Sequence, residues 1–266
     1  PFISAGRRRS RRGIPVGMIS VDIGEGETHE YAIGISAGEV IKNVHGRKSG
    51  AVAAFVNGEE RDMSFSLDEN CKVEPILGDS EEGLYILRHS CAHLLAQAVT
   101  QLYPDAKPTI GPPIEHGFYY DFAMDPIGDE ELRQIEKRMK DLVKQNIPIE
   151  REELDNESLR EIFSSNPFKL EIMDEKIGHD VGSSAYRQGD FIDLCRGPHV
   201  SLTSQLRWFK LTSTSQAYWR ADKDRESLVR IYGMCYSSKD GLKERERQIQ
   251  EAAKRDHKKI GKEMGL

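Results

Sequence analysis

One stretch of the chain combines a helical pattern of apolar residues with a pair of histidines. At roughly 100° per residue, the segment 84–102 is predicted to form a helix. Its apolar stripe consists of Leu87, Cys91, Leu94, Leu95, Ala98 and Leu102. His89 and His93 are four residues apart and lie nearly opposite this stripe. We therefore expect both histidines to point away from the packed face, toward water or a cleft.

A second pair with the same spacing follows about a hundred residues later, where Cys195 and His199 flank Arg196, Gly197 and Pro198. A thiolate and three imidazoles could close a tetrahedral zinc site. The same groups could instead share acid–base work on a bound ester without a metal. The spacing does not separate these interpretations, and two ordinary surface histidines are the third. The segment from His89 to His93 also lacks the glutamate of the HExxH metalloprotease signature, so a peptidase is disfavoured.

Length and composition limit the classes of protein to consider. The chain has 266 residues, which is enough for one large domain or two modest ones. No apolar run approaches the roughly 20 residues that span a bilayer, and no apolar signal segment opens the chain. The four cysteines form neither close pairs nor a dense framework, which favours a reducing compartment. We expect a protein of the cytoplasm with no membrane partner.

The charge of the chain is uneven. The formal net charge of −6 argues against a protein that simply coats nucleic acid. Between residues 186 and 230, however, eight Lys or Arg stand against five Asp or Glu. Aromatic residues lie among these charges, namely Trp208, Phe209, Tyr218 and Trp219. Lys and Arg side chains can bind phosphates and aromatic rings can stack on unpaired bases, so this segment suits the single-stranded end of an RNA. An ordinary mixed-charge surface has the same composition.

The order of short elements predicts an α+β protein with two parts divided at the polar segment 78–83. In the first part we expect strands at 19–23, 31–35, 53–56 and 72–77, with a helix capped by Ser36 and a hairpin at Asn57-Gly58. In the second part we expect helices from Leu84, Asp129 and Asn156. A strand is predicted at 117–122, and one antiparallel sheet is predicted from strands at 168–172, 191–194, 207–211, 217–220 and 228–232. Residues 238–262 are predicted to form a solvated connecting helix.

Several motifs resemble the editing region of the threonyl-tRNA synthetase family. They are the run His89–His93, Gly117-Phe-Tyr-Tyr-Asp121, Asp193-Leu-Cys-Arg-Gly-Pro-His199, Ala217-Tyr-Trp-Arg220 and Arg230-Ile-Tyr-Gly233. The resemblance implies a small β-grasp, ubiquitin-like domain of the TGS type at 18–78 and an editing, or second additional, domain at 79–237. It also implies a linker helix at 238–266 leading toward aminoacylation and anticodon-binding domains that this chain lacks. Residues 1–17 are interpreted as a basic leader, either a transit-peptide remnant pointing to an organelle matrix or a cloning tail.

The resemblance further implies an activity, the hydrolysis of serine wrongly attached to tRNA(Thr), with no aminoacylation by this chain. His89, Lys169 and Cys195 are the catalytic residues that it implies: His89 would position or deprotonate the water, and Lys169 would polarise the water or protonate the leaving oxygen. The substrate-binding residues that it implies are His93, Tyr119, Tyr120, Asp193, Arg196, His199 and Trp219. Asp193 would hold the α-ammonium of the substrate, and Tyr119 or Tyr120 would contact the terminal adenosine.

Further expectations concern the metal, the alternative functions and the partners. We expect no cofactor and no metal; if that is wrong, His89, His93, Cys195 and His199 are the zinc ligands. The alternatives are a zinc-dependent editing protein of the alanyl type and a non-catalytic RNA-binding regulator. The partners implied are tRNA(Thr) carrying serine, and the rest of a synthetase or a second copy of the chain.

Overall fold

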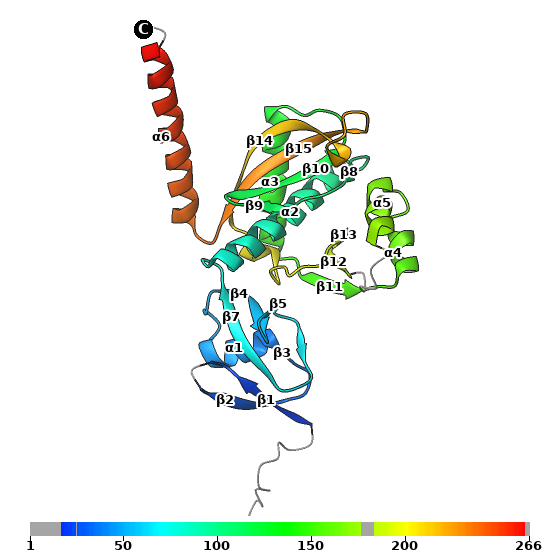
Figure 1. Cartoon of the computed structure of the whole chain (residues 1–266), viewed down its shortest axis with the longest axis vertical. Helices are drawn as coiled ribbons and strands as arrows, with labels where there is room; N and C mark the ends of the chain where they lie inside the picture. The colour runs from blue at the N-terminus through cyan, green and yellow to red at the C-terminus, as the bar shows by residue number, and fades with distance from the viewer. Residues whose placement is uncertain (1–16, 25, 177–183, 264–266) are drawn as a thin grey trace, which may run out of the picture.

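The computed structural model describes residues 17–24, 26–176 and 184–263, with side chains described as far as residue 255 (Figure 1). Helices and mainly antiparallel sheets alternate along the chain, which confirms the predicted α+β class. We refer to residues 17–78 as the N-terminal unit and to residues 79–236 as the larger unit. The predicted leader lies outside the described residues except for Gly17. No helix of the described part is long and apolar enough to cross a membrane.

The N-terminal unit contains a five-stranded sheet and one helix. Its elements are β1 (Met18–Asp22), β2 (Thr28–Ala32), β3 (Ile35–Ser36), α1 (Ala37–His45), β4 (Ala51–Val56), β5 (Glu59–Arg61), β6 (Ser66–Leu67) and β7 (Cys71–Leu77). The strand order is β2-β1-β7-β4-β5, and β3 pairs with β6. The predicted helix and the strands predicted at 19–23, 53–56 and 72–77 are present, whereas the strand predicted at 31–35 is divided by a turn at Ile33 and Gly34 into the end of β2 and the start of β3. Ser36 and Glu39 form a capping box at α1, and Asn57 and Gly58 both have the positive φ of a tight hairpin turn.

Helix α2 (Glu81–Leu102) follows β7 after only three residues. Ser80 caps it by accepting a hydrogen bond from the Gly83 backbone N–H at 3.0 Å. Gly83 has no room for a side chain, because a Cβ there would lie 1.8 Å from the carbonyl oxygen of Leu77. The chain therefore turns from the sheet into the helix within a tightly packed junction.

Helix α2 is buried on nearly all sides. Its predicted stripe packs into the main hydrophobic core, except that Leu102 is 39% exposed. The N-terminal unit contributes Val52, Ala53 and Ile76 to the same core, so the two units share packing across α2. The opposite face, which carries His93, is also covered, and only 4% of His93 is exposed. This face was expected to meet water or a cleft, and it instead borders a largely enclosed site.

The main sheet of the larger unit has the order β14-β15-β10-β8, and β9 pairs with β10. Its strands are β8 (Lys107–Pro108), β9 (Pro113–Ile114), β10 (Gly117–Ala123), β14 (Trp208–Tyr218) and β15 (Ser227–Tyr236). The two strands predicted at 207–211 and 217–220 are thus one long strand with a bulge between Leu211 and Ser213. Short 3₁₀ turns, η1 (Thr203–Gln205) and η2 (Trp219–Ala221), flank β14.

Helix α3 (Asp129–Gln145) packs against α2 and β14. Its stripe matches the prediction, because Ile135, Met139 and Leu142 are fully buried and Leu132 and Val143 are partly buried against the same core. Helix α6 (Lys239–Glu263) begins beside β14 and β15 and projects away from the rest of the chain, as Figure 1 shows. The solvated helix predicted for the last segment is therefore present.

A second, three-stranded sheet overturns part of the prediction. Strands β11 (Ile149–Glu153), β12 (Ser184–Gln188) and β13 (Phe191–Leu194) pair with one another and not with the main sheet. Helix α4 (Asn156–Ile162) is present as predicted. The strand predicted at 168–172 is wrong, because α5 (Pro167–Lys176) is a helix. Asn166 accepts a hydrogen bond from the Lys169 N–H at 3.3 Å, and Pro167 occupies the first helical position, where its missing N–H costs nothing.

Candidate functional site

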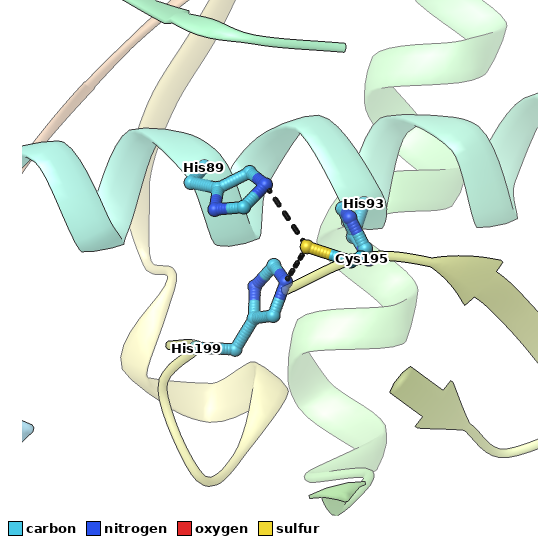
Figure 2. Close-up of side chains that lie close together, drawn as sticks. All are labelled: His89, His93, Cys195 and His199. Carbon is cyan, nitrogen blue, oxygen red and sulfur yellow. Dashed lines mark hydrogen bonds between the residues drawn. The ribbon is translucent and has the colours of Figure 1, made fainter. Parts of the chain in front are cut away.

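Four side chains from two distant segments converge between α2 and the loop that follows β13. His89 and His93 come from adjacent turns of α2, and Cys195 and His199 come from the loop (Figure 2). The Cys195 Sγ lies 3.3 Å from the Nε2 atoms of both His89 and His199. One ligand atom from each of the four residues lies within 4.8 Å of the others. The structure therefore brings together the two pairs that the sequence singled out.

The loop reaches this position through one glycine. Gly197 has φ +70°, a conformation that costs an L-residue roughly 1–2 kcal/mol. A Cβ at this position would also lie 1.8 Å from the hydroxyl oxygen of Tyr186. The Gly197 backbone N–H donates to Cys195 Sγ at 3.3 Å. Gly197 thus allows the turn and also orients the thiol.

The imidazole of His199 is held from both sides. The Ser90 hydroxyl lies 3.0 Å from His199 Nδ1 and accepts a hydrogen bond from the Val200 N–H at 3.1 Å. The ring of Tyr186 packs edge-on against His199 with 4.4 Å between the ring centroids. Because Ser90 directly follows His89 on α2, these contacts tie the loop to the histidine helix.

A second polar cluster adjoins the four side chains. Lys169 Nζ lies 2.5 Å from Asp193 Oδ1, and the Tyr120 hydroxyl donates to Asp193 Oδ2 at 2.6 Å. Lys169 also donates to the Tyr120 oxygen at 3.1 Å. His93 connects the two clusters, because its Nε2 lies 3.7 Å from Asp193 Oδ2. These four side chains are at most 4% exposed by residue, so few waters compete for their hydrogen bonds.

Burial sets the protonation states around Cys195. It lowers the pKa of His89 to about 3, with a further lowering from His93, and it lowers the pKa of His93 to about 4. It also lowers the pKa of His199 well below the usual value and raises that of Cys195 to about 12. At neutral pH the three imidazoles are therefore uncharged and the thiol is protonated. A protonated thiol is a poor nucleophile, so Cys195 is not activated in this state.

The four donors also fit a tetrahedral metal ion. Zinc bonds of about 2.0–2.3 Å to nitrogen and sulfur place neighbouring donor atoms about 3.3–3.7 Å apart. The two sulfur–nitrogen distances of 3.3 Å agree with that geometry. Lys169 does not oppose a cation as strongly as its charge suggests, because Asp193 pairs with it. With all four donors bound, however, the tetrahedron is closed and has no position for a reacting water.

Three predicted binding residues do not join the four converging side chains. Trp219 is 1% exposed and packs edge-on against Phe168 in a separate apolar cluster, so its ring cannot stack on a nucleobase in this structure. Tyr119 points to the opposite side of β10 from Tyr120, where the Arg230 guanidinium lies 4.0 Å from its ring centroid. Arg196 belongs to the loop itself, directly after Cys195, but is exposed to solvent. The assignment of Trp219 to substrate binding is therefore corrected to a supporting role under α5.

Comparison with known proteins places these residues in context. Residues 184–232 match the family model described as the threonyl and alanyl tRNA synthetase second additional domain. Threonine–tRNA ligase from Rubrobacter xylanophilus is 42% identical over 251 residues, which cover 94% of this chain and 39% of that protein. The enzymes from Francisella tularensis subsp. novicida and Streptococcus thermophilus are 41% and 40% identical, again over 94% of this chain. The predicted resemblance to threonyl-tRNA synthetases is confirmed. The chain spans about two-fifths of the length of these relatives.

The segment that matches the threonyl and alanyl tRNA synthetase second additional domain contains only part of the site. Asp193, Cys195 and His199 lie within it, whereas His89 and Lys169 lie outside it. Three further residues that hold the site, Asp62, Ser90 and Tyr186, were not predicted. Ser90 sits inside the histidine motif and could have been found there. Asp62 bonds to Tyr186 and to the His199 backbone across 124 and 137 residues, and a single sequence does not reveal such contacts.

Proposed function

We propose that this chain hydrolyses the ester of serine wrongly attached to tRNA(Thr) and spares the threonyl ester. One observation supports the proposal above all. In a chain similar to threonyl-tRNA synthetases, three imidazoles and a thiol converge beside a buried Lys169–Asp193–Tyr120 cluster. Groups of these kinds can position water, stabilise charge and transfer protons during ester cleavage.

The need for such a reaction follows from the chemistry of the two amino acids. Serine lacks one methyl group of threonine and keeps the hydroxyl that a threonine pocket binds. One methyl group changes binding by only about 1–3 kcal/mol, so a threonine pocket rejects serine poorly. A second site that admits the smaller side chain and excludes the larger one removes the error.

The substrate would approach from the side of His89. This histidine is half-buried, whereas His93 and His199 are almost fully enclosed. Because burial lowers the pKa of His89 to about 3, its imidazole is neutral and would orient the attacking water by a hydrogen bond rather than remove its proton completely.

Lys169 and Asp193 would complete the reaction. Asp193 would bind the α-ammonium group of the seryl ester, in competition with the bonds that its two oxygens now make to Lys169 and Tyr120. An incoming ammonium group would weaken the hold of Asp193 on Lys169. The Lys169 ammonium would then protonate the departing ribose oxygen as the ester C–O bond breaks, and the proton lost by the attacking water would return to the Lys169 amine.

A panel of three charged RNAs tests the proposal. The chain should deacylate Ser-tRNA(Thr) without ATP, since ester hydrolysis needs only water and the site. Thr-tRNA(Thr) should react far more slowly. Equal rates on the two esters would contradict the proposed discrimination by side-chain size. Preference for Ser-tRNA(Ala) would indicate the alanyl type of editor, and no turnover on any RNA would favour a non-catalytic RNA-binding regulator.

A zinc-dependent editor is the second candidate because the four donors fit a tetrahedral ion. We favour the metal-free reaction, since four protein donors around zinc would exclude the attacking water. The purified protein should therefore keep its full rate after dialysis against a chelator. Elemental analysis before and after dialysis, with zinc added back, makes the comparison quantitative. One retained zinc per chain that is required for turnover would overturn the metal-free mechanism.

Replacing His89 by alanine should lower the turnover number by roughly 10- to 100-fold, because the attacking water loses the group that orients it. The affinity for tRNA should change much less, since His89 is assigned to the transition state. Single-turnover kinetics and filter binding separate the two effects. His116→Ala is the matched control, because His116 is a surface histidine outside the site. A parallel loss of affinity and rate would move His89 to a binding role.

The partners are part of the same proposal. We infer that tRNA(Thr) carrying serine is the substrate. The aminoacylating region of a synthetase, on the same chain or another, would supply it, and a second copy of the chain is compatible with this arrangement.

A further inference from the structure

Asp62 links the N-terminal unit to the candidate site. It follows β5 directly, yet both oxygens of its half-buried carboxylate are used by the larger unit. Asp62 Oδ1 accepts a hydrogen bond from the backbone N–H of His199 at 2.9 Å. Asp62 Oδ2 accepts one from the Tyr186 hydroxyl at 2.6 Å. Hydrogen bonds to a carboxylate are shorter and stronger than neutral ones, so this contact can fix the position of both donors.

Two routes lead from Asp62 to the site. The first is direct, because the bonded N–H belongs to His199, whose imidazole lies 3.3 Å from Cys195 Sγ. The second runs through Tyr186. Its hydroxyl occupies the space against Gly197 where a Cβ would otherwise lie, and the Gly197 N–H in turn donates to Cys195 Sγ. The ring of Tyr186 also packs against His199. The Asp62 carboxylate therefore restrains the backbone and ring of His199 and the thiol of Cys195.

We propose that Asp62 is a positioning residue, through which the N-terminal unit fixes the arrangement of Cys195 and His199. This inference rests on the proposed function for its kinetic consequence, but its structural consequence can be measured independently. Asp62 acts on the loop and makes no contact with the reacting atoms. Groups that orient site residues in this way commonly change activity by roughly 10- to 100-fold when they are removed.

The test compares four variants of the full chain. Asp62→Ala removes both acceptors. Asp62→Asn keeps an oxygen for the His199 N–H and offers its amide N–H to the Tyr186 oxygen. Tyr186→Phe removes only the second route. Asp68→Ala is the control, because Asp68 is an exposed carboxylate of the same unit whose only side-chain hydrogen bond in the described structure is local, to Ser66.

Two readouts are used. The first is the alkylation rate of Cys195 by iodoacetamide, followed peptide by peptide with mass spectrometry so that Cys71 is scored separately. The second is the kinetics of seryl-ester hydrolysis. We expect Asp62→Ala to raise the Cys195 alkylation rate at least tenfold and to lower kcat about tenfold with little change in KM. Asp62→Asn should restore both values to within about threefold, and Tyr186→Phe should lie between them.

The outcomes are separable from failure of the proposed function. If the wild-type chain hydrolyses no ester, the alkylation rates still decide whether Asp62 holds the loop. Wild-type alkylation and kinetics in a folded Asp62→Ala variant would overturn the inference. An Asp62→Asn variant as impaired as Asp62→Ala would overturn the hydrogen-bonding role. If Asp62→Ala does not fold, equal alkylation of Tyr186→Phe, Asp62→Asn and wild type overturns the inference, whereas faster alkylation in Tyr186→Phe supports it.

Discussion

Replacing Lys169 by methionine is expected to lower seryl-ester turnover at least about 100-fold and the free energy of unfolding by about 3–5 kcal/mol. Methionine keeps much of the length of the side chain but removes the charge that lies 2.5 Å from Asp193 Oδ1. Both partners are almost fully buried, so Asp193 would be left as an uncompensated internal carboxylate. Steady-state kinetics and urea denaturation measure the two effects separately.

The pH dependence of the Lys169→Met effect provides an internal check. In the intact pair, burial raises the pKa of Asp193, but Lys169 and His93 together bring it below the usual value. The pair therefore stabilises the fold above the unfolded carboxyl pKa of about 4, and this contribution is lost as pH falls through the lower folded value. Without Lys169, burial dominates and the folded pKa rises above the unfolded one. The destabilisation should consequently be smaller at pH 5 than at pH 8.

Lys144→Met is the matched control for this prediction, because Lys144 forms an exposed ion pair with Asp141 on α3. It should leave turnover and unfolding close to wild type at both pH values. If Lys169→Met altered only the affinity for tRNA, Lys169 would be a phosphate or ribose contact. Its assignment to the leaving oxygen would then be withdrawn.

Replacing Gly197 by alanine is expected to destabilise the protein by about 3 kcal/mol or more and to abolish most of the activity. Backbone strain and the clash with Tyr186 both contribute. Gly189→Ala separates them, because Gly189 also has positive φ, +61°, but a Cβ there has no neighbour closer than 3.5 Å. Gly189→Ala should cost only about 1–2 kcal/mol. Equal unfolding free energies for the two variants would show that the contact with Tyr186 is not restrictive.

The histidine helix was predictable because its apolar pattern is long. The 3.6-residue repeat is sustained from Leu84 to Ala98, and the i, i+4 spacing fixes the relative direction of His89 and His93. The second pair, Cys195 and His199, could be recognised as ligand types but not placed, since a loop has no periodicity. The packing of Tyr186 against Gly197 and the hydrogen bonds of Ser90 show how that loop turns back to α2.

The helix at 167–176 was missed for a physical reason. The run Phe168-Lys-Leu-Glu-Ile172 alternates apolar and polar residues, which is the pattern of a half-buried strand. The Asn-Pro dipeptide before it is a helix-start signal that the alternation obscured. Strand β11 was missed because four of its five residues are charged, and pairing with β12 rather than local pattern makes it a strand.

The junction at Gly83 has a consequence for how the chain moves. Ordinary domain linkers absorb motion, because their backbone is exposed and free to rotate. Here Gly83 packs directly against the backbone of Leu77, so the turn between β7 and α2 has no free space. Helix α2 then continues without interruption to His89 and His93. If the N-terminal unit tilted, α2 would therefore tilt with it and displace His89 and His93. A flexible insertion at this joint would uncouple α2, and with it His89 and His93, from the sheet of the N-terminal unit, even with every site residue intact.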